Sequence, residues 1–126
     1  MLDILEYLTK EFKSVCPRVY EGNAKDEAIF PYIVFSLPNS NAPDDDNNVE
    51  SVTLEIDIWD YSQDSYDATK NVEILANRIE ELLKYNRELG DDYLLIFSKR
   101  NRFKLNDPDN NMKRRQLRYN IKYYNK

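Results

Sequence analysis

The residues best suited to chemistry in this sequence are two carboxylates near its centre. Glu55 and Asp57 stand two positions apart in a stretch of alternating apolar and polar residues, so both would lie on one face of a β-strand. Such a pair could act as general acid and base or hold Mg²⁺, but the sequence supplies no third ligand or positioned base. Ten basic residues follow between positions 98 and 126. We therefore predict that these carboxylates pair with basic residues across a sheet.

A second acidic grouping partly fits the calcium-binding loop of EF-hands. The ligands at loop positions 1, 3, 5 and 12 would be Asp44, Asp46, Asn48 and Glu55. The sixth position of such a loop is glycine, which makes its sharp turn, and here it is Val49. Glu55 also lies in a predicted strand, whereas the last ligand of the loop should enter a helix. We therefore predict no metal site.

The remaining residue types exclude most other catalytic chemistry. Because there is no histidine, His-based triads, Cys-His dyads and most transition-metal sites are excluded. The two glycines, Gly22 and Gly90, are too few for a glycine-rich phosphate loop. Cys16 is the only cysteine, and at the end of an amphipathic helix it should be a small packed residue. We predict that the protein is not an enzyme and uses no cofactor.

The element that must position the central carboxylates is a long strand from Val49 to Ser62. Its apolar residues share one parity, which predicts a single apolar face. These residues are Val52, Leu54, Ile56 and Ile58. Four further strands are predicted over residues 18–21, 30–37, 93–105 and 114–123. Pro31 and Pro38 should begin and end the strand at 30–37.

Two helices are predicted from apolar residues at helical spacing. The first should run from Leu2 to about Ser14, and the second should begin at a cap formed by Asp64 or Ser65. Gly90 is a plausible stop for the second helix. The apolar stripe of the first is Leu5, Leu8, Phe12 and Val15, and that of the second is Val72, Leu75, Ala76, Ile79, Leu82 and Leu83.

The order α-β-β-β-α-β-β predicts an α+β fold, with a mainly antiparallel sheet and both amphipathic helices packed on its apolar face. The last two strands should form a hairpin around the turn cluster at 106–111. At 126 residues, we expect a single domain over 1–126. Residues 38–48 have almost no apolar side chain, which predicts a mobile acidic loop.

The first residues include acids where a signal peptide would need a basic start, and no apolar run approaches the ~20 residues of a membrane span. We expect a soluble protein with no membrane partner.

Charge is distributed unevenly along the chain. Residues 26–69 contain eleven acids and no Lys or Arg, whereas residues 98–126 carry a net charge of +8. This split is either compensated within the sheet or exposed as two opposite poles. The basic hairpin could also bind nucleic acid, but a sequence pI near 4.8 argues against specific binding.

Several segments together resemble a family of phage proteins. They are Phe-Pro-Tyr-Ile-Val-Phe-Ser-Leu at 30–37, Ile-Asp-Ile-Trp-Asp at 56–60, the helix over 68–83, and Leu-Arg-Tyr-Asn-Ile-Lys-Tyr-Tyr at 117–124. In this order they resemble the tail terminator, or tail-to-head joining (tail completion), proteins of long-tailed bacteriophages. The resemblance covers nearly the whole chain.

The resemblance implies a structural virion protein of the tail or neck, assembled in the host bacterial cytoplasm. Its subunits would form a homo-oligomeric ring, a hexamer, that caps the tail tube and provides the interface for joining the head. The implied partners are other copies of the chain, the tail tube protein and the head-tail connector or neck proteins. Two alternatives stay open: a neck or head-completion adaptor, and a small nucleic-acid-binding module using the basic C-terminal hairpin.

The uneven charge suits a head-to-tail contact in which the acidic segment of one subunit meets the basic segment of the next. We hypothesise that the interface includes Asp44, Asp45, Asp46, Arg100, Arg102, Arg114, Arg115 and Arg118.

Overall fold

The computed structural model describes residues 2–25, 27–41, 49–91, 93–106 and 108–125. In chain order, its elements are α1 (Leu2–Lys13), β1 (Val19–Glu21), β2 (Tyr32–Asn41), β3 (Val49–Tyr61), α2 (Ser65–Leu82), β4 (Arg87–Leu89), β5 (Tyr93–Asn106) and β6 (Met112–Asn125). The predicted α+β class and the predicted order are confirmed. The structure adds β4, a three-residue strand that carried no pattern long enough to detect.

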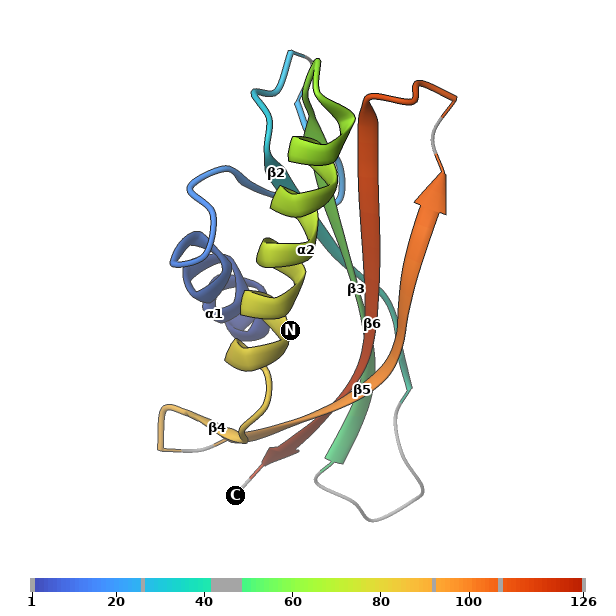
Figure 1. Ribbon diagram of the computed structural model, residues 1–126. Helices are drawn as coiled ribbons and strands as arrows, with labels where there is room; N and C mark the ends of the chain where they lie inside the picture. Colours follow the sequence, from blue (N-terminus) through green and yellow to red (C-terminus); the bar gives the residue numbers. More distant parts are fainter. Residues whose placement is uncertain (1, 26, 42–48, 92, 107, 126) are drawn as a thin grey trace.

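The strands form one sheet in the order β1-β2-β3-β6-β5-β4. Neighbouring strands are antiparallel except for β1 and β2, which are parallel. The two long central strands pair along their whole length, from Val49 opposite Tyr124 to Tyr61 opposite Met112. The predicted hairpin of β5 and β6 is confirmed. Both helices lie on the same side of the curled sheet, which leaves its other face without a helical layer (Figure 1).

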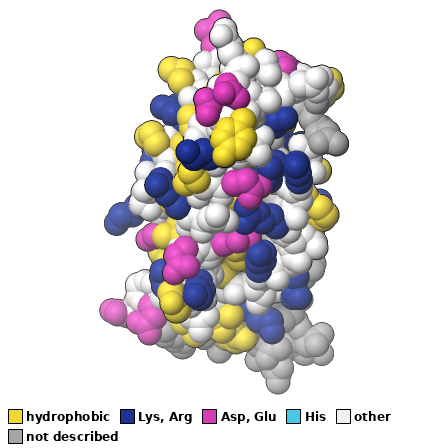
Figure 2. Space-filling view, viewed as in Figure 1, with side chains coloured by type: hydrophobic (Ala, Val, Ile, Leu, Met, Phe, Trp, Pro, Cys, Tyr) yellow, Lys and Arg dark blue, Asp and Glu magenta, His cyan; other side chains and the backbone are white. Residues whose placement is uncertain are grey.

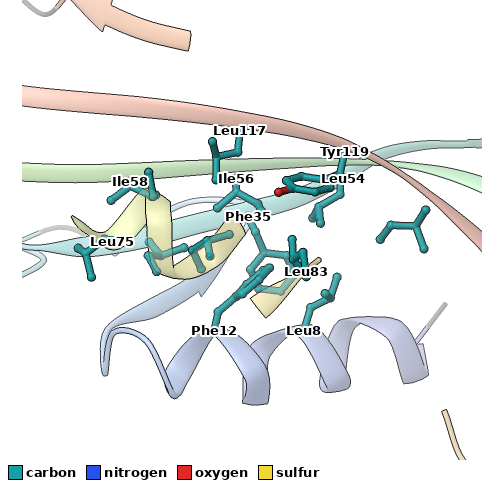
Figure 3. Packing of buried hydrophobic residues seen from close by; sticks show 14 of the residues in the cluster. Leu8, Phe12, Phe35, Leu54, Ile56, Ile58, Leu75, Leu83, Leu117 and Tyr119 are labelled. Atoms are coloured by element: carbon teal, nitrogen blue, oxygen red, sulfur yellow. The ribbon is translucent and has the colours of Figure 1, made fainter. Parts of the chain in front are cut away.

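The hydrophobic core lies between the helices and the sheet (Figure 3). The four apolar residues predicted for the central strand are all fully buried, so the predicted alternation of β3 is confirmed. The ring of Phe12 from α1 meets the ring of Phe35 from β2 edge to face, with 5.3 Å between the ring centroids. Cys16 is buried in the same core, as predicted, with its thiol 3.5 Å from the carbonyl oxygen of Pro31.

The buried face of α1 differs slightly from the predicted stripe. Ile4, Leu8 and Phe12 are fully buried, whereas Leu5 and Val15 are only partly buried. Ile4 and Leu5 are adjacent apolar residues, so helical spacing alone is compatible with either one facing the sheet. The packing of Phe12 against the sheet decides the rotation of the helix.

The start of α2 was predicted correctly, but its end was not. Asp64 is the N-cap, and its side chain accepts a hydrogen bond from the backbone N–H of Tyr66 at 2.9 Å. The helix ends at Leu82, well before Gly90. The chain turns there to form β4, and Gly90, with φ of +64°, lies in the turn that follows this strand.

The second strand is longer than predicted. Pro38 does not end it, because β2 continues to Asn41 after a register shift between Ser36 and Asn39. A proline at such an irregularity removes no regular ladder hydrogen bond, which is why the strand can pass through it. The first four residues of the predicted loop, 38–41, therefore belong to β2, and residues 42–48 lie outside the described residues.

Candidate interaction surfaces

The two central carboxylates are paired with basic residues across the sheet, as predicted. Glu55 and Asp57 alternate with the buried residues of β3, so their side chains lie on the face of the sheet away from the core. An Nη2 atom of Arg118 lies 3.3 Å from the Glu55 carboxylate, and that of Arg114 lies 2.8 Å from the Asp57 carboxylate. Gln116 donates a further hydrogen bond to Asp57 at 3.1 Å. These carboxylates are therefore neutralised by β6 and do not form an acid–base pair.

The two arginines of these ion pairs also contact aromatic rings. The guanidinium carbon of Arg114 lies 4.6 Å from the centroid of the Trp59 ring, within the range of a cation–π interaction. Arg118 lies over Phe103 in the same way, at 5.6 Å. The outer face of the sheet thus alternates ion pairs with aromatic rings.

A second set of ion pairs ties the β5–β6 hairpin to α2. Glu73 of α2 contacts both Arg115 and Arg102, and Glu80, two turns further along, contacts Arg102 at 3.1 Å and Lys99 at 2.6 Å. Arg115 is only 3% exposed. The network therefore holds the helix on the inner face of the hairpin.

The charge of Glu73 is favoured by this network. Burial by itself would raise the pKa of Glu73, but the hydrogen bond from Arg115 and the nearby charge of Arg102 outweigh it and lower the pKa below its ordinary value. Glu73 is therefore an ionised link between the two arginines at neutral pH.

The hypothesised interface residues fall into three groups. Arg102, Arg114, Arg115 and Arg118 all make ion pairs within the chain, and Arg115 is also buried. Arg100 lies exposed where the β5–β6 register shifts, and no carboxylate in the described part of the chain pairs with it. The acidic group at 44–46 lies outside the described residues.

Much of the charge split is therefore compensated within the chain. Figure 2 shows basic and acidic side chains interspersed on the visible face instead of in two separate poles. The acids left exposed in the described part of residues 26–69 are Glu27, Asp64 and Asp67.

A group of aromatic side chains that was not predicted from the sequence lies at one end of the sheet. The rings of Phe30 and Tyr32 have centroids 5.1 Å apart, and the centroid of Tyr61 lies 6.0 Å from that of Phe30. Tyr32 also faces Trp59 across the β2–β3 ladder and meets Tyr20 at 6.0 Å. Part of the signal was available, because Trp59 and Tyr61 share the parity of Glu55 and Asp57 in the central strand.

Exposed apolar residues occur in the chain segments that adjoin this group. Ile29 is 68% exposed, Tyr66 is 69% exposed and Tyr61 is 41% exposed. The N-terminus of α2, the end of β3 and the start of β2 lie at the same end of the molecule (Figure 1). We call Ile29, Phe30, Tyr61 and Tyr66 the aromatic end patch.

Two further findings bear on the kind of site. Among the described residues, no three or more Cys, Asp or Glu side chains are grouped so that they could hold a metal ion. Of the four ligands in the calcium-loop comparison, Glu55 alone lies among the described residues, and it is paired with Arg118. None of the helices in the described ranges is long and apolar enough to cross a membrane.

The fold is of the α+β class, and its exposed aromatic rings are of the residue type that is enriched in protein–protein interfaces. The chain belongs to the family described as tail completion protein gp17, whose model matches residues 7–124. It is thus a structural component of a bacteriophage tail, from a family concerned with tail completion and so with neighbouring tail or head proteins. A search of curated proteins found no match.

Proposed function

We propose that this protein is a tail terminator, a hexameric ring that caps the finished tail tube and then presents the surface to which the head is joined. Membership of the tail completion family is the observation that carries this proposal. The ring assembles in the host cytoplasm from single subunits and acts by binding, without a catalytic step. Its partners are other copies of the chain, the tail tube protein and the connector or neck proteins.

The contacts between subunits are head-to-tail, so that different surfaces of one subunit meet in each contact. The acidic residues Asp44, Asp45 and Asp46 and the exposed Arg100 contribute to these contacts through their charge. Arg102 and Arg115 contribute indirectly, because their ion pairs with α2 hold the hairpin in place.

The ion pairs within the chain weaken the case for nucleic-acid binding by the hairpin. Five of its basic residues, Lys99, Arg102, Arg114, Arg115 and Arg118, already face carboxylates of the same subunit. Binding to phosphates would require these charges to be free, and it would weaken steeply with salt.

The test is negative-stain electron microscopy of the purified protein mixed with tail tubes of the phage that encodes it. We expect six-fold rings at one end of each tube and no further growth of capped tubes when tube protein is added. Binding to isolated portal or neck complexes, with no binding to tube ends, would favour the neck adaptor and contradict the terminator.

A further inference from the structure

We propose that, in the ring, the aromatic end patch of one subunit docks on the outer edge of β5 of a second copy. This inference rests on the proposed function, because it assigns the two surfaces that build the ring. Of the residues that it uses, only Arg100 is among the charged interface residues that were hypothesised from sequence.

The aromatic end patch has the composition of a contact surface. Large aromatic side chains are enriched at the centres of protein interfaces, where they supply much of the binding energy. Ile29 and Tyr66 are each more than two-thirds exposed, although both side chains are largely apolar. The rings of Phe30 and Tyr61 contact each other at an interplanar angle of 38°.

The outer edge of β5 provides the second surface. Only Tyr93, Leu94 and Leu95 of β5 pair with β4, so from Ile96 onward no strand among the described residues covers this edge. Its exposed side chains include Arg100, Phe103 and Lys104, and Phe103 is 38% exposed. Phe103 is opposite Gln116 and Lys104 is opposite Arg115, so these two side chains flank the edge from the outer and the helical face of the sheet. We call these three residues the β5 strip.

The form of this edge selects its partner. Basic side chains and a register irregularity beside Arg100 discourage indiscriminate strand pairing, which an open edge would otherwise invite. In the described part of the chain, no carboxylate forms an ion pair with Arg100 or Lys104. The strip is therefore suited to an apolar surface bordered by acids.

The aromatic end patch is such a surface. All four of its residues come from positions 26–69, which contain no Lys or Arg. Most of the acidic residues that this stretch contributes to β3 are buried or paired with arginines. Glu27, Asp64 and Asp67 are exposed, and each is within a few residues of a patch residue in the sequence. The charges that the subunit leaves uncompensated thus match across the proposed contact.

The two surfaces also lie where a ring requires them. Ile29 and Phe30 precede β2, Tyr61 ends β3 and Tyr66 lies in the first turn of α2. The strip lies on β5, which is separated from β3 by β6 in the sheet. When two copies meet through one contact between a patch and a strip, the other patch and the other strip stay unoccupied. They produce a head-to-tail series that closes into a ring or continues as a filament.

The test uses two double variants, each of which removes one surface. The patch variant is Ile29→Ser with Tyr66→Ser, and the strip variant is Arg100→Glu with Lys104→Glu. All four side chains are exposed in the subunit, so both variants should fold, which circular dichroism and thermal unfolding can confirm. The matched controls are Tyr85→Ser, another exposed tyrosine, and Lys10→Glu with Arg78→Glu, an equal charge change on the helical layer.

Sedimentation velocity follows free subunits, and negative-stain images follow the ends of tail tubes. We expect each surface variant to need an at least about tenfold higher subunit concentration than the wild type to form rings. The controls should assemble like the wild type. An equimolar mixture of the two surface variants should form 1:1 dimers and stop there, because only one of the possible contacts keeps both surfaces intact.

The outcomes separate the two proposals. If the wild type forms rings and both surface variants form them equally well, the assigned surfaces are wrong and the terminator function stands. Variants that lose assembly but form no dimer on mixing would also overturn the head-to-tail assignment. A wild type that forms no ring, either free or on tubes, would overturn the proposed function and this inference with it.

Discussion

The ion pair between Glu73 and Arg115 should contribute unequally to stability through its two partners. Arg115 is 3% exposed, whereas the Glu73 side chain is 42% exposed. If Glu73 is changed to Gln, the guanidinium loses its counter-ion and keeps a hydrogen bond to the Arg114 carbonyl oxygen, at 3.0 Å. Breaking a buried ion pair by removing one partner typically costs 3–5 kcal/mol of unfolding free energy. We expect about 3 kcal/mol, the lower end of this range, because a glutamine oxygen can still accept from Arg115.

The opposite change should cost less. Arg115→Met places an apolar side chain of similar length in the buried position, and Glu73 keeps both its contact with Arg102 and access to water. We therefore expect a loss of about 1 kcal/mol. The double variant should be no less stable than Glu73→Gln alone, because no buried charge is left without a partner.

Urea unfolding followed by circular dichroism measures these differences, and thermal unfolding gives an independent check at about 3–5 °C per kcal/mol for a domain of this size. The control pair is Glu55→Gln and Arg118→Met on the outer face of the sheet, where each change should cost at most about 1 kcal/mol. The reasoning would be refuted if Arg115→Met were more destabilising than Glu73→Gln.

Four further outcomes are expected. Because the folded-state pKa of Glu73 is lowered, its contribution to stability is complete above its ordinary pKa of 4.5 and is lost as the pH falls through the folded-state value. In urea unfolding across this range, the unfolding free energy of Glu73→Gln should therefore fall less with decreasing pH than that of the wild type. Burial, followed by the charge of Glu80, raises the pKa of Tyr119 to about 12, so stability should decline as the pH rises from 10 to 12, and Tyr119→Phe should reduce that decline in the same assay. Asp64→Ala removes the N-cap of α2 and should cost about 1 kcal/mol in urea unfolding, whereas a loss below the error of measurement would contradict the cap assignment. Arg114→Gln should alter the fluorescence of Trp59, the only tryptophan, with at most about 1 kcal/mol lost, and an unchanged spectrum would argue against the stacked arrangement.

Local patterns predicted most of the fold. Alternation along β3 identified its buried face, since side chains of a strand point to opposite sides at every step. Helical spacing identified both helices, and their order relative to the strands implied two layers. The pairing of Glu55 and Asp57 with the basic hairpin also followed from the sequence, because both groups fall on polar strand faces and carry opposite charge.

Other features depended on contacts between distant positions. Which arginine meets which carboxylate is set by the register of β3 against β6, and the partners Asp57 and Arg114 are 57 residues apart. The sequence pattern likewise could not show that Pro38 lies at an irregularity inside β2, because that depends on its pairing with β3.

The sequence by itself thus determined both helices, the long strands, the buried face of β3 and the uneven charge. Only the tertiary structure decided which of those charges stay available. Packing of α2 on the hairpin buries Arg115 and engages Arg102, while Arg100 is left exposed on the outer strand. The pairing of β2 with β3 brings Phe30 and Tyr61 together at one end of the sheet. Periodicity describes one element at a time, whereas a surface is made where several elements meet.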